Sequence, residues 1–233
     1  MIVLGIDTSG YVNAVGVVDG DRIIADVSFS AKTDSLEQII DNIDSTLKKN
    51  NLTLKDVQGI GVGLGPGSWT GIKVGVTVGK MLAFSTMKPV AGIPTLEALA
   101  YAARKESPLV YAVISAGIQD TVYVAAYRIT GNDIIREGDY FTGNVIDLAP
   151  LIKEPVLLVG GGVAQYREMI IKENPSLKNK VTVLEALPSG AAVACLASKR
   201  LEQGKSDNPF SLTPLYLKES TAKVFVNKYA SKT

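Results

Sequence analysis

The spacing of apolar residues along the chain switches several times between the period of a β-strand and that of an α-helix. Short apolar runs, rich in β-branched residues and bounded by turns such as Asp19-Gly20-Asp21, predict the strands of the first half. Longer segments with apolar residues three and four positions apart predict its helices. In order, we expect strands over 2–7, 12–18 and 22–29, a helix over 34–49, a strand over 57–64, a helix over 70–84, a strand over 88–93 and a helix over 95–106.

The same order of elements recurs after Ser107-Pro108. The predicted elements are strands over 109–115, 121–129 and 133–140, a weak helical stretch over 145–152, a strand over 155–160, a helix over 163–172, a strand over 181–184 and a helix over 189–203 closed by Gly204. Two successive β-β-β-α-β-α units favour a duplicated α/β fold with mixed sheets, of the ribonuclease H-like or actin-like kind. We therefore expect two lobes and a tail, at 1–106, 107–218 and 219–233.

The helix over 34–49 is amphipathic, with Asp34 or Ser35 at its expected cap. Its apolar face consists of Leu36, Ile39, Ile40, Ile43 and Leu47. Such a face is ordinarily part of the core. Because the helix over 70–84 is also largely apolar, an interface between helices of two chains is a second interpretation.

The stretch from Gly61 to Phe84, GVGLGPGSWTGIKVGVTVGKMLAF, joins a strand to a helix through a Gly-Pro-Gly turn. It is neither a Walker A motif nor a GxGxxG motif. The turn either only starts the helix, with Ser68 or Thr70 as its cap, or forms a nucleotide site shared with a partner, because free N–H groups at a helix N-terminus attract anions. Candidate nucleotide or phosphate contacts are Asp7, Ser9, Gly65, Gly67, Ser68 and Thr70.

Gly71, Gly75 and Gly79 follow one another at intervals of four residues in the second helix. Glycine costs about 1 kcal/mol relative to alanine inside a helix, so a repeated glycine requires a compensating contact. We interpret the glycine strip as a groove for a helix of another chain, flanked by a polar stripe of Lys73, Thr77 and Lys80. The predicted partner-binding residues are Leu36, Ile39, Ile40, Ile43, Leu47, Gly71, Ile72, Lys73, Gly75, Val76, Gly79 and Lys80.

Composition narrows the classes of function. The net charge of +1 provides no strong field toward nucleic acid or acidic lipid, and no apolar run reaches the roughly 18 residues of a membrane span. The start of the chain lacks the basic residues of a signal peptide, and the single Cys195 excludes an internal disulfide. We therefore expect a cytoplasmic protein without a membrane partner, in which Cys195 is inert core.

The sequence contains no histidine, which excludes Ser-His-Asp and Cys-His triads and histidine-ligated zinc. Asp7 stands where actin-like ATPases place a metal-facing carboxylate, but the matching strand of the second half ends in Ser115 rather than in an acid. We expect Asp7 to cap its own turn, and no catalytic residue, metal site or intrinsic cofactor. An independent ATPase or phosphotransferase of the actin-like fold is the alternative.

Two further features allow more than one interpretation. The turn Gly160-Gly161-Gly162 either admits an adenine or ribose or only lets a strand and a helix pack closely. The tail carries Lys223, Lys228 and Lys232 and no acid after Glu219, a pattern that usually means a solvated terminus and less often a contact with an RNA backbone.

The central stretch resembles the GPGSFTGLRIG-type signature of the universal tRNA threonylcarbamoyladenosine family. Together with the segments GIDTSG, PSGAAVACLA and PLYLKES, it is similar to the TsaB (YeaZ) branch of that family. The resemblance implies an actin-like (ASKHA) fold of two ribonuclease H-like lobes, with mixed sheets flanked by helices, and a non-catalytic role. Such proteins support the catalytic TsaD and the ATPase TsaE in transferring threonylcarbamoyl to adenosine in tRNA.

By the same resemblance, the chain pairs with TsaD, or with a second copy when alone, through the helices over 34–49 and 70–84. ATP or ADP would bind at the interface with a partner, and tRNA would be contacted only through the complex. The sequence departs from the family pattern at Asp34-Ser35-Leu36-Glu37, where a His-Ser-Glu run is common, and at Ser115-Ala116-Gly117, where Asp-Ala-Arg is usual. A homodimeric chaperone-like module is a third reading of the same features.

Overall fold

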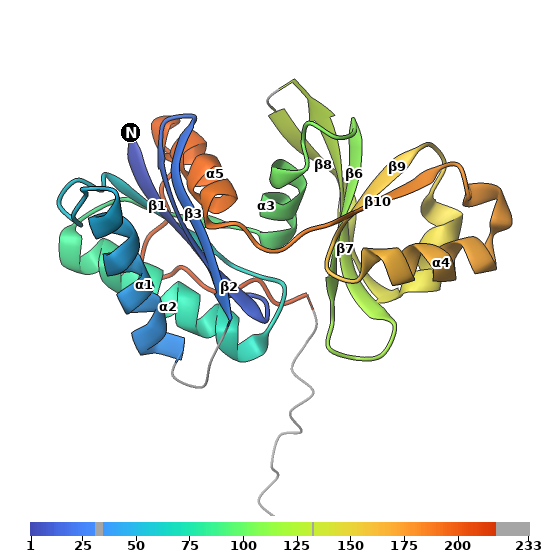
Figure 1. The fold of residues 1–233 in the computed structure, drawn as a ribbon, viewed down its shortest axis with the longest axis horizontal. Coiled ribbons are helices and arrows are strands. Elements are labelled where there is room, and N and C mark those ends of the chain that lie inside the picture. Colours follow the sequence, from blue (N-terminus) through green and yellow to red (C-terminus); the bar gives the residue numbers. More distant parts are fainter. Residues whose placement is uncertain (31–34, 132, 218–233) are drawn as a thin grey trace, which may run out of the picture.

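The computed structural model describes residues 1–30, 35–131 and 133–217, and for Ser35 and Leu36 the backbone alone. Two mixed five-stranded sheets stand side by side, each with helices on its outer face, and two further helices lie between them (Figure 1). This arrangement confirms the predicted fold class of two mixed-sheet lobes flanked by helices. We call the two sheets with their covering helices the first and the second lobe.

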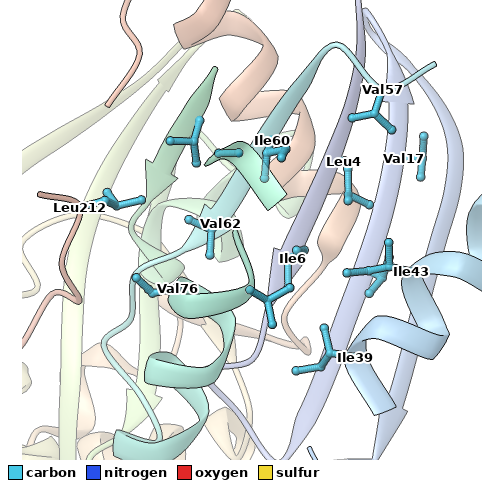
Figure 2. Packing of buried hydrophobic residues seen from close by; sticks show 14 of the residues in the cluster. Leu4, Ile6, Val17, Ile39, Ile43, Val57, Ile60, Val62, Val76 and Leu212 are labelled. Carbon is cyan, nitrogen blue, oxygen red and sulfur yellow. The ribbon is translucent and has the colours of Figure 1, made fainter. Parts of the chain in front are cut away.

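The first sheet has the order β3-β2-β1-β4-β5. Its strands are β1 (Ile2–Asp7), β2 (Val12–Asp19), β3 (Arg22–Ser30), β4 (Gly59–Gly63) and β5 (Val90–Ile93). The strands β1, β2 and β3 form an antiparallel meander, and β4 and β5 add to it in parallel. Helices α1 (Ser35–Lys49) and α2 (Trp69–Thr86) cover its outer face, and Figure 2 shows Ile39 and Ile43 of α1 pointing toward the sheet.

The second sheet has the order β10-β9-β6-β7-β8 and repeats the same topology. Its strands are β6 (Leu109–Ser115), β7 (Thr121–Thr130), β8 (Asp133–Asn144), β9 (Val156–Gly160) and β10 (Val181–Glu185). On its outer face lie the 3₁₀ helix η1 (Val145–Leu151) and α4 (Val163–Glu173), which bury Leu148 and Ile170 against the sheet. A second short 3₁₀ helix, η2 (Pro175–Leu177), follows α4.

The two central helices are exchanged between the lobes. Helix α5 (Gly190–Glu202) lies directly on the first sheet, where a Cβ atom at Gly16 would be 2.0 Å from the backbone nitrogen of Ala191. Helix α3 (Thr95–Ala102) packs instead on the second sheet, with Leu96 and Leu99 in one cluster with Tyr127. Each lobe is therefore completed by a helix from the other half of the chain.

The order and type of the predicted elements agree with the structure, and the differences lie at their ends. Helix α3 ends at Ala102 rather than continuing to Glu106, because the backbone nitrogens of Arg104 and Glu106 donate to the carbonyls three residues earlier, at 3.3 and 3.0 Å, instead of four residues earlier. Strand β8 runs to Asn144 because it pairs with β7 along its length. The sequence did not predict η2. Of the two expected caps of α1, Asp34 lies outside the described residues and Ser35 is the first residue of the helix.

No helix in the described ranges combines the length and the apolar content that crossing a bilayer would require.

Candidate functional site

The end of β1 is built around the buried carboxylate of Asp7. Its Oδ1 accepts hydrogen bonds from the backbone nitrogen and from Oγ of Ser9, at 2.8 and 2.6 Å, and its Oδ2 accepts one from Thr95 Oγ1 at 3.1 Å. Burial raises the pKa of the Asp7 carboxyl, although these hydrogen bonds act in the opposite direction. Both carboxylate oxygens are thus engaged inside the chain, as expected of a residue that caps its own turn.

The Gly-Pro-Gly turn packs directly on this carboxylate-capped turn. The Ser68 backbone nitrogen donates to the Ser9 carbonyl at 2.6 Å, and a Cβ at Gly67 would lie 2.2 Å from the same oxygen, so only glycine fits there. Ser68 Oγ accepts from the Gly71 nitrogen at 3.3 Å and caps α2. Of the two predicted caps, Ser68 is therefore the one used.

The interpretation of the glycine strip as a groove for a foreign helix is wrong. A Cβ at Gly71 would lie 2.1 Å from the Thr8 carbonyl oxygen, and one at Gly75 would lie 2.2 Å from Thr8 Oγ1. A Cβ at Gly79 would meet the Val62 side chain at 3.0 Å. The strip faces the protein's own interior because it lets α2 approach the end of β1, where Thr8 Oγ1 donates to the Gly71 carbonyl at 2.6 Å.

Most of the residues predicted to bind a partner are in the core of the first lobe. The buried members are Ile39, Ile43, Leu47, Ile72, Gly75, Val76 and Gly79. Ile40 is half exposed, Gly71 is partly buried, and the Leu36 side chain lies outside the described part of the chain. Buried side chains offer no surface to a partner, so these residues stabilise the packing of α1 and α2 on the first sheet rather than contact another chain.

The two predicted lysines contact their own chain. Lys73 Nζ lies over the Trp69 ring, 4.2 Å from its centroid. Lys80 Nζ donates to the carbonyl oxygens of Leu212 and Phe210 at 3.0 and 3.4 Å, so it fixes the segment that follows α5 against α2. A lysine held by two carbonyls is an internal contact rather than a free donor for a partner.

An exposed apolar surface remains at the C-terminal end of α2. We call it the Phe84 patch; its members are Met81, Phe84, Met87 and Phe210. Met81 and Phe84 are 60% and 63% exposed, and the rings of Phe84 and Phe210 meet edge to face at 5.3 Å between centroids. Phe210 joins the patch only through tertiary structure, because it lies far from α2 in the sequence.

A cleft of about 910 Å³ opens between the two lobes. Its lining residues are Ser9, Gly10, Tyr11, Val12, Gly67, Ser68, Trp69, Leu99, Val113, Ile114, Ser115, Ala116, Gly117, Ile118, Tyr123, Gly161, Ala186, Leu187 and Pro188. We call it the interlobe cleft. Of the candidate nucleotide contacts, it brings together Ser9, Gly67 and Ser68, but Asp7, Gly65 and Thr70 are not among its lining residues.

The chemistry of the interlobe cleft is apolar and uncharged. None of the described residues that line it carries a charged side chain, and its mouth exposes the rings of Tyr11 and Trp69. Sequence reasoning missed Tyr11 and Trp69 as lining residues, although Tyr11 lies two positions after Ser9 and Trp69 directly follows Ser68, both of which it named as candidate contacts. Such a wall favours an apolar or neutral occupant over a phosphate.

The turn Gly160-Gly161-Gly162 is held by the carboxylate of Glu185. Glu185 accepts hydrogen bonds from the backbone nitrogens of Gly162 and Ala164 at 2.8 and 2.9 Å, so it occupies the N-terminus of α4. A phosphate at this position would meet the Glu185 charge.

Within residues 1–30, 35–131 and 133–217, no group of three or more Cys, Asp or Glu side chains is placed to hold a metal ion.

Comparison with known proteins places this architecture in a family. The model of the tRNA N6-adenosine threonylcarbamoyltransferase family (TsaD) matches residues 24–225. This chain belongs to that family. It is 27% identical over 173 residues to the tRNA threonylcarbamoyladenosine biosynthesis protein TsaB of Bacillus subtilis, an alignment that covers 73% of this chain and 75% of that protein.

The family includes longer relatives. The tRNA N6-adenosine threonylcarbamoyltransferase of Bacillus anthracis is 32% identical over 143 residues, which are 53% of this chain. The alignment covers only 42% of that transferase, so the chain corresponds to less than half of its length.

Solved structures agree on the fold. YeaZ from Pseudomonas aeruginosa superposes with a TM-score of 0.79 over 93% of this chain and 99% of that one, at 23% identity. A ROK hexokinase from Thermus thermophilus superposes with a TM-score of 0.51 over 88% of this chain, at 14% identity. Both similarities show that the two described lobes have an actin-like fold.

Proposed function

We propose that this chain is a non-catalytic subunit required for the transfer of threonylcarbamoyl to adenosine in tRNA. Membership of the transferase family and the similarity to TsaB support a role in the formation of threonylcarbamoyladenosine. The non-catalytic role is supported by the site: Asp7 is buried with both oxygens engaged, and the described lining of the interlobe cleft has no charged group. Chemistry on a charged substrate would have to occur on another subunit.

The Phe84 patch is the observation that carries this proposal. Exposed aromatic and methionine side chains that cluster at one end of a helix are typical of protein interfaces. We expect the patch to bind the catalytic subunit TsaD, and a second copy of this chain when TsaD is missing. TsaE would join the assembly, and tRNA would be contacted through the complex. The glycine strip supports this surface from inside, because it sets how deeply α2 packs on the sheet.

ATP or ADP at the interface with a partner is part of the same proposal. Ser68 and Thr70 are exposed at the N-terminus of α2, the end of a helix that favours anions. Because the described cleft wall lacks charged groups and Glu185 occupies the N-terminus of α4, the partner would have to supply the cations for the phosphates.

Reconstitution of tRNA modification tests the proposal. Threonylcarbamoyladenosine formation by TsaD and TsaE homologues should require this chain, and Phe84→Asp should abolish both co-purification with TsaD and modification. Leu151→Asp is the matched control, since Leu151 is a half-exposed apolar residue on η1 of the second lobe. It should behave like the unmodified chain. Both variants should keep the circular dichroism of the parent.

Two results would contradict the proposal. Full modification by the Phe84→Asp protein would mean that the patch does not dock the catalytic subunit. Turnover of ATP by the isolated chain, lost in Asp7→Ala, would favour the alternative of an independent ATPase or phosphotransferase of the actin-like fold.

A further inference from the structure

Three segments of the second lobe bring basic side chains together at one end of its sheet. Strands β9 and β10 are parallel neighbours that start at the same edge. Lys180, directly before β10, donates a hydrogen bond from Nζ to the Lys153 carbonyl at 3.0 Å. Arg167 of α4 donates one from Nη2 to the Lys178 carbonyl, also at 3.0 Å. We call this region the Lys180 surface; its members are Lys153, Arg167, Lys178 and Lys180.

Two members of the surface carry charges that the described chain does not neutralise. Lys153 and Lys178 are exposed, and within residues 1–30, 35–131 and 133–217 neither ammonium group has a hydrogen bond or an ion pair. Two acids of the same region are already paired with arginines. Glu154 accepts from both Nη atoms of Arg128, at 3.1 and 2.8 Å, and Glu168 accepts from the arginine of the surface at 2.7 Å.

The Lys180 surface therefore has an excess of positive charge. Lys180 keeps its charge although its ammonium binds a carbonyl. Lys172 and Glu173, in the last turn of α4, are neighbours of opposite charge and cancel. The net charge of the whole chain is only +1, so this local excess is not apparent from composition. Charges gathered on one face attract an anion at short range even when the whole protein is nearly neutral.

The position of the Lys180 surface keeps it apart from the Phe84 patch. Helix α2 covers the outer face of the first sheet and α4 covers the outer face of the second, on opposite sides of the molecule (Figure 1). Both sheets lie between the two surfaces. A protein bound at the Phe84 patch therefore leaves the Lys180 surface available to a second ligand.

The chemistry of the Lys180 surface favours a phosphate backbone over a protein. Its members include no aromatic or apolar anchor, whereas the centre of a protein interface is poor in charge and rich in aromatic residues. Lysine and arginine side chains are the usual donors to the phosphate oxygens of a nucleic acid. Under the proposed function the complex acts on tRNA, which presents such phosphates.

We propose that in the assembled complex the Lys180 surface binds the phosphate backbone of the tRNA substrate. The inference rests on the proposed function and deepens it, because it gives this chain a direct contact with the RNA. Lys153 and Lys178 supply the free charges, and Lys180 adds its own from a position fixed by the Lys153 carbonyl. Phosphate contacts carry no sequence information, so the surface adds affinity and the catalytic subunit selects the adenosine.

Charge reversal in the reconstituted complex tests this contact. The double variant Lys153→Glu with Lys178→Glu should raise the KM for tRNA by about tenfold and leave kcat unchanged, because the surface adds affinity rather than chemistry. Lys55→Glu with Lys205→Glu is the matched control, since it makes the same change of charge at two exposed lysines outside the surface. It should leave both constants unchanged. Circular dichroism and co-purification with TsaD verify that each variant folds and assembles.

Salt dependence gives a second measurement. With Lys153→Gln and Lys178→Gln, the slope of log Kd for tRNA against log salt concentration should fall by about 1.5, because each lost phosphate contact removes about 0.7–0.9. The docking control Leu151→Asp lies two positions from Lys153, so it is compared at saturating tRNA, where a change of RNA affinity does not alter the rate.

The outcomes separate this inference from the proposed function. If the parent chain is not required for modification, the proposed function fails and the inference fails with it. If the parent chain is required but the charge-reversed variant keeps the parent KM and salt slope, only the inference is overturned. An equal rise of KM in the control would also overturn it, because the effect would then come from net charge. So would weaker binding of the variant to phosphatidylserine vesicles at unchanged tRNA affinity, which would assign the surface to a lipid headgroup.

Discussion

Alanine substitution along the glycine strip distinguishes an internal role from a docking role. A Cβ at Gly71 or Gly75 would lie within 2.2 Å of a backbone or hydroxyl oxygen of Thr8, whereas a Cβ at Gly79 meets only the Val62 side chain, at 3.0 Å or more. If the strip served a partner instead, each alanine would have open space in the isolated chain. The two roles therefore predict opposite changes in the stability of the protein alone.

Two terms of opposite sign set the magnitude. Alanine gains about 1 kcal/mol over glycine inside a helix, and forcing a methyl group into a packed site costs about 1–3 kcal/mol. At Gly75, Thr8 Oγ1 can move only by losing its 2.6 Å hydrogen bond to the Gly71 carbonyl, which adds about 1 kcal/mol. We expect Gly75→Ala to lower the free energy of unfolding by about 1–3 kcal/mol, Gly71→Ala to lower it by up to about 2 kcal/mol, and Gly79→Ala to change it by less than about 1 kcal/mol.

Urea unfolding followed by circular dichroism measures these differences as shifts of the midpoint at unchanged slope. Thr77→Ala is the matched control, because Thr77 is exposed on the same helix, and it should raise the free energy of unfolding by up to about 0.5 kcal/mol. If all three glycine variants raise the midpoint as the control does, the contacts with Thr8 are absent and the strip is open to a partner.

Two further predictions concern carboxylates that the structure engages internally. Because burial raises the pKa of Asp7, its ionisation opposes folding: the stability of the parent relative to Asp7→Asn should be greatest below about pH 3.9 and fall as the pH rises through the raised pKa. Parallel urea midpoints for both proteins between pH 4 and 7 would contradict this. Asp26 accepts from Ser189 Oγ and the Ala191 nitrogen at 2.7 and 3.0 Å, so Asp26→Ala should destabilise the protein by about 1 kcal/mol, less at high salt. Asp44→Ala, at an exposed ion pair of α1, is the control and should cost less in the same urea titration.

The periodicity of the sequence was sufficient to predict the secondary structure and the fold class. Strands such as Ile2–Asp7 and helices such as Trp69–Thr86 are defined by local apolar spacing and by turn residues, and local interactions determine where they form. Local chemistry also limited the cap of α2 to Ser68 or Thr70 and predicted that Asp7 caps its own turn, because the contacts of Ser68 with Gly71 and of Asp7 with Ser9 join residues close in sequence. The contact of Asp7 with Thr95 joins residues far apart and was not predicted. The ends of α3 and β8 depended on the backbone hydrogen bonds of Arg104 and Glu106 and on pairing with β7, which are not visible in periodicity.

The sequence by itself determined which elements form, that they repeat, and that no histidine chemistry is available. Only the tertiary structure decided which surface each element presents. A strip of glycines has the same sequence pattern whether it packs against Thr8 of its own chain or against another chain. Only the packing of α2 on the end of β1 shows that Gly75 faces Thr8. The exchange of α3 and α5 between the lobes, and the meeting of Phe84 with Phe210, join residues far apart in the chain. Such contacts depend on the summed burial of many side chains, which no local window of sequence contains.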